Sequence, residues 1–149
     1  MAESRFVYVT YIRAPEDKVW AALTSPELNR RFWFGYHQDS TWEVGSPWRA
    51  ISPKGEVADT GQVLEFDPPR RYAVTWRNEA EPALTAEGHT TATFVLEAVA
   101  GGLTKLTVTH QIDRAASQMI ERVSTGWPKV LSGLKSLLET GQALDGPLG

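Results

Sequence analysis

The stretch from Gly126 to Gly141 constrains the fold of this chain more than any other segment. When its residues are placed 100° apart, the apolar ones gather on one side of a helix, in an arc of about 120°. They are Trp127, Val130, Leu131, Leu134, Leu137 and Leu138. Pro128 suits a first helical turn, and Gly141 follows the last turn, where glycine commonly ends a helix. A helix of about 13 residues is unstable alone in water, so we expect the rest of the chain to bury this arc.

Seven earlier segments have the β-branched and aromatic content, or the alternation, that is typical of strands. They are residues 6–12, 42–44, 47–51, 57–66, 71–77, 89–98 and 103–112. Gly101-Gly102 joins the last two as a hairpin. Two short helices are expected after the first strand, one that Pro15 opens and one from Pro26 to about Arg31. Hairpin-type connections predict an antiparallel sheet.

Two further segments complete the predicted path of the chain. Residues 78–88 are expected to form an acidic surface loop between strands, and Asp113 is expected to cap a helical segment. The apolar period of that segment continues into the last helix, which allows one helix with a kink at residues 126–128. The predicted fold class is α+β, with one domain over residues 1–149. A curved antiparallel sheet of about six or seven strands surrounds the long C-terminal helix, and two short helices follow the first strand.

Composition excludes several classes of function. The formal net charge is −3 and no block of like charges occurs, which argues against a nucleic-acid surface or a membrane anchor. The chain has no cysteine, so a disulfide framework or a thiol nucleophile is excluded. The first residues lack the apolar region of a signal peptide, and no apolar run reaches the length of a membrane span. We therefore expect a cytoplasmic protein without membrane insertion.

Two groups of residues resemble a known family. The N-terminal group is Pro15, Val19-Trp20, Leu23-Thr24, Pro26 and Trp33, and the C-terminal group is Gly126-Trp127, Leu131, Leu134 and Leu138-Glu139. Together they resemble the AHSA1-like branch of the START/Bet v 1 (SRPBCC) superfamily, over about Arg5 to Gly141. The resemblance implies a helix-grip fold with a deep apolar cavity between sheet and C-terminal helix. Various members use that cavity for lipids, aromatic polyketides and similar small molecules. The family shares no catalytic residue set, so we carry none over.

The side chains expected to line this cavity come from the aromatic segments, the strands and the last helix. They are Trp33, Trp48, Tyr72, Trp76, Phe94, Val108, His110, Trp127, Leu131 and Leu134. His110 is the most informative polar residue among them, because it alternates with apolar residues on its strand. It is either a core histidine that is hydrogen-bonded to a neighbour or a polar group that orients a ligand.

No motif indicates a metal, a cofactor or a catalytic group. His37, His89 and His110 are far apart in sequence and lack the spacing of a metal-binding motif. Neither a glycine-rich phosphate loop nor a nucleophile elbow occurs. We expect no cofactor, no metal and no catalytic residue.

Three functions remain open. The first is a carrier or sensor that binds a hydrophobic, aromatic or lipid-like small molecule between the sheet and the C-terminal helix. The second is an enzyme that acts on an aromatic or polyketide-like substrate in the same cavity. The third is a protein-binding regulator, such as an Hsp90-type co-chaperone, which would need an exposed apolar patch.

Overall fold

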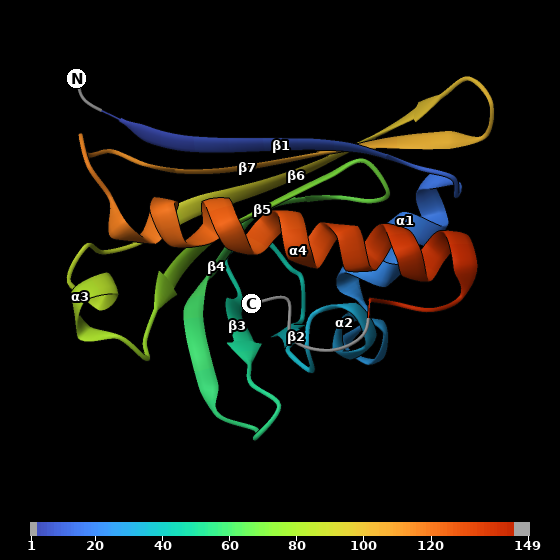
Figure 1. Cartoon of the computed structure of the whole chain (residues 1–149). Coiled ribbons are helices and arrows are strands. Elements are labelled where there is room, and N and C mark those ends of the chain that lie inside the picture. Colours follow the sequence, from blue (N-terminus) through green and yellow to red (C-terminus); the bar gives the residue numbers. More distant parts are fainter. Residues whose placement is uncertain (1–2, 145–149) are drawn as a thin grey trace.

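The computed structural model describes residues 3–144, which form a seven-stranded antiparallel sheet and four helices. The strands are β1 (Ser4–Ile12), β2 (His37–Ser40), β3 (Pro47–Ile51), β4 (Val57–Asp67), β5 (Arg71–Asn78), β6 (Thr90–Val99) and β7 (Leu103–Ile112). The helices are α1 (Glu16–Thr24), α2 (Pro26–Phe32), α3 (Pro82–Thr85) and α4 (Gln118–Thr140). The strand order is β1-β7-β6-β5-β4-β3-β2. The helix-grip architecture expected from the sequence is confirmed (Figure 1).

The sheet curves because its strands are irregular at two places. The register shifts between Ala50 and Ile51 where β3 pairs with β4, and between Val63 and Glu65 where β4 pairs with β5. Such bulges bend a strand and increase its twist. Gly61 allows a close approach in the same region, because a Cβ atom there would lie 1.7 Å from the carbonyl oxygen of Thr75. These features add to the local twist of β3, β4 and β5.

Helix α4 lies along the concave face of this sheet, beside α3 at its N-terminal half and beside α1 and α2 at its C-terminal half (Figure 1). It is one helix with Pro128 inside it. Its apolar stripe is buried as predicted, except that Leu138 is only partly buried, and Gly141 ends the helix with a positive φ of 86°. The predicted cap at Asp113 is wrong. Ser117 is the N-cap, and its Oγ accepts a hydrogen bond from the Ile120 N–H at 3.1 Å.

Two other predicted segments, one strand and one loop, also differ from the structure. The expected strand at residues 42–44 is absent, and a strand forms at His37–Ser40 instead. In residues 42–44 the aromatic side chain packs against the sheet rather than forming a strand, because the Trp42 ring stacks on Phe66 with centroids 5.5 Å apart. The loop at residues 78–88 contains α3, whose Leu84 is buried. It is therefore tied to the core, rather than being only a solvent-exposed connection.

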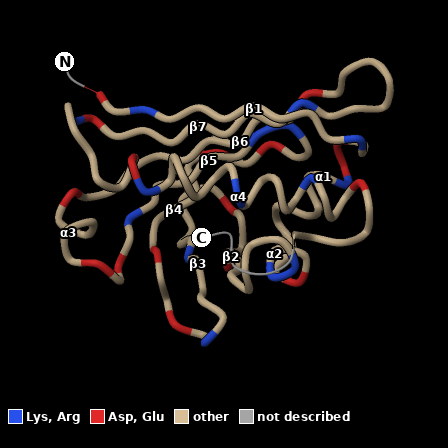
Figure 2. The backbone as a smooth tube through the Cα atoms, viewed as in Figure 1, with Lys and Arg blue, Asp and Glu red and all other residues tan. Residues whose placement is uncertain are grey.

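Charged residues of both signs are spread along the chain, and neither sign dominates a region (Figure 2). Most of the pairs between them lie at the surface, such as Arg71 with Glu65 and Lys135 with Glu139. Exposed pairs of this kind contribute little to stability. The fold therefore depends on the apolar core between sheet and α4. No helix within residues 3–144 is long and apolar enough to cross a membrane.

Candidate functional site

Four tryptophans meet where the N-terminal half of α4 crosses β5. Trp76 on β5 lies against Trp48 of β3, Trp33 after α2 and Trp127 of α4, with ring centroids 4.3, 5.9 and 5.5 Å apart. Trp33 also lies 5.5 Å from Trp127. Offset and edge-on contacts at these distances are the favourable geometries for aromatic rings. Trp48, Trp76 and Trp127 are buried, whereas Trp33 is partly exposed.

A cleft of about 470 Å³ opens beside this group of rings. Trp33 and Trp76 form its aromatic wall, and Val123, Gly126 and Val130 of α4 form the facing wall. The strand side is made by residues of β3, β4 and β5, and the outer rim by Ala80 and Glu81 just before α3 and by the loop after α2. In Figure 1, α3, β3 and β4 lie below the N-terminal half of α4. Trp127 lines an adjoining space of about 310 Å³.

Asp59 is the acidic group on the strand side of the cleft. It lies on β4 directly opposite Ala50 of β3 and Asn78 of β5, and all three line the cleft. Only 8% of the surface of Asp59 is exposed to solvent. Burial, with a smaller contribution from the nearby Glu79, raises the pKa of this carboxyl to about 6, although hydrogen bonds from Trp76 and Asn78 act to lower it. A carboxylate in this position is costly to keep ionised, since burial disfavours charge.

Trp76 contributes a second incompletely satisfied polar group. Its indole N–H is buried and has no hydrogen-bond partner of good geometry among residues 3–144. It lies close enough to the Asp59 carboxyl to favour the ionised form. Buried donors without a partner are rare in folded proteins and commonly mark a site for water, an ion or a ligand. The cleft therefore combines a flat apolar wall with two polar groups that can accept and donate hydrogen bonds.

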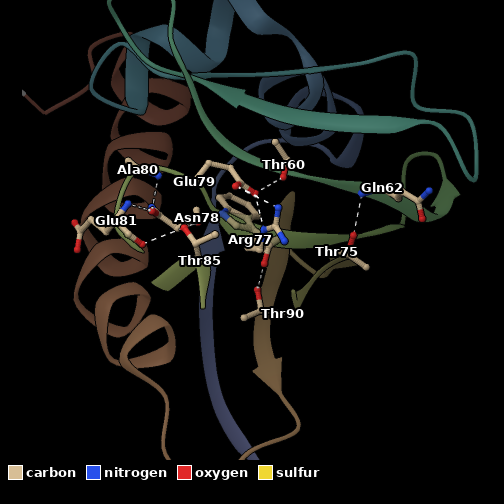
Figure 3. Close-up of polar contacts among 11 residues, drawn as sticks. Thr60, Gln62, Thr75, Arg77, Asn78, Glu79, Ala80, Glu81, Thr85 and Thr90 are labelled. Atoms are coloured by element: carbon tan, nitrogen blue, oxygen red, sulfur yellow. Dashed lines mark hydrogen bonds and ion pairs between the residues drawn. The ribbon is translucent and has the colours of Figure 1, made fainter. Parts of the chain in front are cut away.

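The loop after β5 forms part of the rim of the cleft and contacts α4. The Asn78 Oδ1 accepts hydrogen bonds from the backbone N–H groups of Ala80 and Glu81, at 3.0 and 2.9 Å (Figure 3). The Glu81 carboxylate then accepts two hydrogen bonds from the Arg122 guanidinium, at 2.6 and 2.7 Å. This bidentate geometry fixes orientation as well as charge. It joins α3 to α4 across one side of the cleft.

His110 lies deeper, and its ring is hydrogen-bonded on both sides. The Trp127 indole N–H donates to His110 Nδ1 at 3.1 Å. Because an indole can only donate, Nδ1 accepts and Nε2 carries the proton, which it donates to Thr90 Oγ1 at 2.6 Å. Thr90 donates in turn to the Trp76 carbonyl at 2.7 Å. Burial lowers the pKa of His110 to about 3, so the ring is neutral. This chain of bonds crosses the core from α4 to β5.

The structure separates the residues expected to bind a ligand into two sets. Trp33, Trp76 and Trp127 line the cleft or the space beside it. The others are buried in the core: Trp48, Tyr72, Phe94, Val108, His110, Leu131 and Leu134. Their role toward a ligand stays a prediction. Within residues 3–144 no group of three or more histidine, aspartate or glutamate residues could hold a metal ion.

Asp59 was missed by sequence reasoning, although a signal for it exists. It has the same strand parity as Gly61 and Val63, and Val63 is buried in the core. An aspartate on the inward parity of a strand is unusual, because unpaired charges are rarely buried. That parity would have identified Asp59 as a candidate polar group on the concave face of the sheet.

Comparison with protein families identifies the chain. The family described as Activator of Hsp90 ATPase homolog 1-like protein matches residues 13–139. The chain belongs to this family. It is thus an AHSA1-like member of the START/Bet v 1 superfamily, as its sequence indicates. Membership supports a ligand-binding or regulatory role for this AHSA1-like chain. Comparison with curated proteins finds no match.

Solved structures similar to this AHSA1-like chain share its fold over nearly the whole length. Protein MLL2253 from Mesorhizobium loti is 25% identical, with a TM-score of 0.76, over 91% of this chain and 97% of its own. ChR145 from Cytophaga hutchinsonii is 27% identical, with a TM-score of 0.72, over 95% and 97%. PFC0360w, an HSP90 activator from Plasmodium falciparum, is 20% identical, with a TM-score of 0.70, over 90% and 95%. The last similarity shows the fold alone.

Proposed function

We propose that this protein is a carrier or sensor that binds a planar, largely apolar small molecule in the cleft beside Trp33 and Trp76. The observation that carries the proposal is the cleft itself. Its volume of about 470 Å³ lies within the range of small-molecule sites, about 300–1,000 Å³. Its walls combine two indole rings with aliphatic side chains of α4. Flat rings stack well on such a surface.

The location refines the expectation from sequence. The sequence predicts a cavity between the sheet and the C-terminal helix, with Trp127, Leu131 and Leu134 among the residues that line it. The two leucines are buried against the sheet, together with Phe94 and Val108. The cleft lies instead at the N-terminal half of α4, where Gly126 presents no side chain. We therefore place the proposed ligand against residues 123–130, with one ring face on Trp33.

Isothermal titration calorimetry with 1-naphthalenemethanol, a neutral flat probe, tests this function. We expect saturable binding with a Kd below about 100 μM, or about −5.5 kcal/mol. Trp33→Ala removes one wall, so the Kd should rise at least about tenfold, or about 1.4 kcal/mol. A native mass spectrum of the purified protein would show whether a small molecule of this kind is retained.

Trp42→Ala is the matched control. Trp42 is also a partly buried tryptophan, but it packs on Phe66 and Tyr72, away from the cleft. The control variant should bind the probe like the wild-type protein. Absence of any binding by the wild-type protein, or equal losses in both variants, would contradict the proposed function.

A further inference from the structure

We propose that Asp59 anchors the ligand of this cleft, and that the ligand carries a positively charged nitrogen beside its flat ring. This inference rests on the proposed function and makes it more specific. It assigns the ligand class, an aromatic cation, from the polar groups that the cleft offers. The argument depends on three features: the carboxyl itself, the indole N–H beside it and the charges around the rim.

The carboxyl of Asp59 is nearly enclosed and has no cationic partner. Among the residues described, it takes part in none of the ion pairs, and the two side chains that donate toward it, Trp76 and Asn78, are uncharged. Its cross-strand neighbours, Ala50 and Asn78, are uncharged. A buried carboxylate is normally paired, because removal from water without a partner is costly. The partner that the carboxyl lacks is a cation, and the cleft is the side from which one can arrive.

The ring of Trp76 can attract the same cation. It forms part of the cleft wall, and its N–H lies near the same carboxyl. A cationic nitrogen that contacts Asp59 therefore also lies close to the rings of Trp76 and Trp33. Tryptophan faces attract cations within about 6 Å of the ring centroid. Carboxylate and rings thus favour the same charge on the ligand.

The charges at the rim leave this preference intact. Arg122 is paired with both oxygens of Glu81, so its charge is neutralised locally. The Asp59 pKa is raised to about 6 by burial and by Glu79, and neither Arg122 nor Lys129 contributes to the shift. Asp59 is therefore ionised above that pH, without a cation near enough to offset it. A bound anion would be repelled by Asp59, and a neutral hydrocarbon would enclose the carboxylate without a partner.

Three naphthalene probes with different charges test the inference at pH 7.5. They are 1-naphthylmethylammonium, 1-naphthalenemethanol and 1-naphthoate, and their affinities are measured by isothermal titration calorimetry. The wild-type protein should bind the cation at least about tenfold more tightly than the alcohol, and the anion most weakly. Asp59→Asn keeps the shape and removes the charge, so the cation and the alcohol should then bind within about threefold of each other.

Asp67→Asn is the control, because Asp67 is an exposed aspartate at the end of the same strand. It should keep the full preference for the cation. Retention of that preference by Asp59→Asn would overturn the inference, as would tighter binding of the alcohol or the anion by the wild-type protein. If the alcohol binds without any preference for the cation, the anchor is wrong while the proposed function stands. If none of the three probes binds, both are wrong.

Discussion

Burial of the Asp59 carboxyl lowers the free energy of unfolding at pH values where the group is ionised. Its pKa is raised by burial from 3.8 to about 6, so the folded state binds a proton more readily than the unfolded chain does. Stability is therefore unaffected by this group below about pH 3.8, falls between there and pH 6, and carries the full penalty above pH 6. A shift of about two units corresponds to about 3 kcal/mol.

The first prediction concerns this penalty. Asp59→Asn should raise the free energy of unfolding by about 1–3 kcal/mol at pH 8 and by much less at pH 4.5. Urea unfolding at the two pH values measures the difference. Asp67→Asn, at an exposed position of β4, should show no such dependence. An equal effect of Asp59→Asn at both pH values would mean that the carboxyl is well solvated.

At the same scale, sequence reasoning reached His110 and missed Asp59. His110 was visible because three apolar residues of the same parity flank it on β7. Its hydrogen-bond partners, Thr90 and Trp127, were not predictable, because they come from β6 and α4. Asp59 was overlooked although it shares the parity of Val63, because the register shift after Val63 breaks the alternation along the rest of β4. Single residues are predictable only where the period of their strand is unbroken.

At the scale of one element, the local sequence of α4 predicts its buried face and its C-terminal end, whereas its N-terminal end depends on a contact distant in sequence. Its apolar stripe and its C-terminal glycine were evident in the sequence. Its start was not, because part of the cap comes from outside the helix. The Glu87 carboxylate, which precedes β6, accepts hydrogen bonds from Ser117 Oγ and the Gln118 N–H, at 2.6 and 2.7 Å. This contact lies about thirty residues away in sequence and cannot be inferred from the local pattern.

The second prediction follows from this cap. Glu87→Ala should lower the free energy of unfolding by about 1–2 kcal/mol at neutral pH. Burial opposes the charge of Glu87, but the hydrogen bonds from Ser117, Gln118 and Met119 outweigh it and lower the pKa. The stabilisation is thus present above the usual glutamate pKa and is lost as the pH falls through the lowered value.

Denaturant unfolding at pH 7 and pH 3 measures this effect, with Glu121→Ala as the control. Glu121 lies in the first turn of the same helix but is exposed, and its side chain does not take part in the cap. The control variant should lose less stability than Glu87→Ala. Equal losses in the two variants would mean that only the helix dipole is involved.

For the whole molecule, the hairpin order of the sheet and the places of α1, α2 and α4 were predictable because each hairpin and each apolar period is local, whereas α3 and the position of β2 were not. The amount of space left between sheet and helix was not predictable either. It depends on how the rings of Trp48, Trp76 and Trp127 turn against each other, and on the bulges that curve β3 and β4. The sequence therefore predicts a helix-grip fold with a ligand between the sheet and the C-terminal helix, and with Leu131 and Leu134 among its contacts. We instead propose a ligand site at one end of that helix.

The most direct test of this site is a nuclear magnetic resonance titration of the labelled protein with 1-naphthylmethylammonium. The six tryptophans give six indole N–H signals. We expect the signals of Trp33 and Trp76 to shift saturably, together with the amides of Val123, Gly126 and Val130. The Trp48 indole, which donates to Gln38 in the core, should shift little. Shifts centred on Leu131, Leu134 and Phe94 would contradict the account, because they would place the ligand in the interior beneath the C-terminal half of α4.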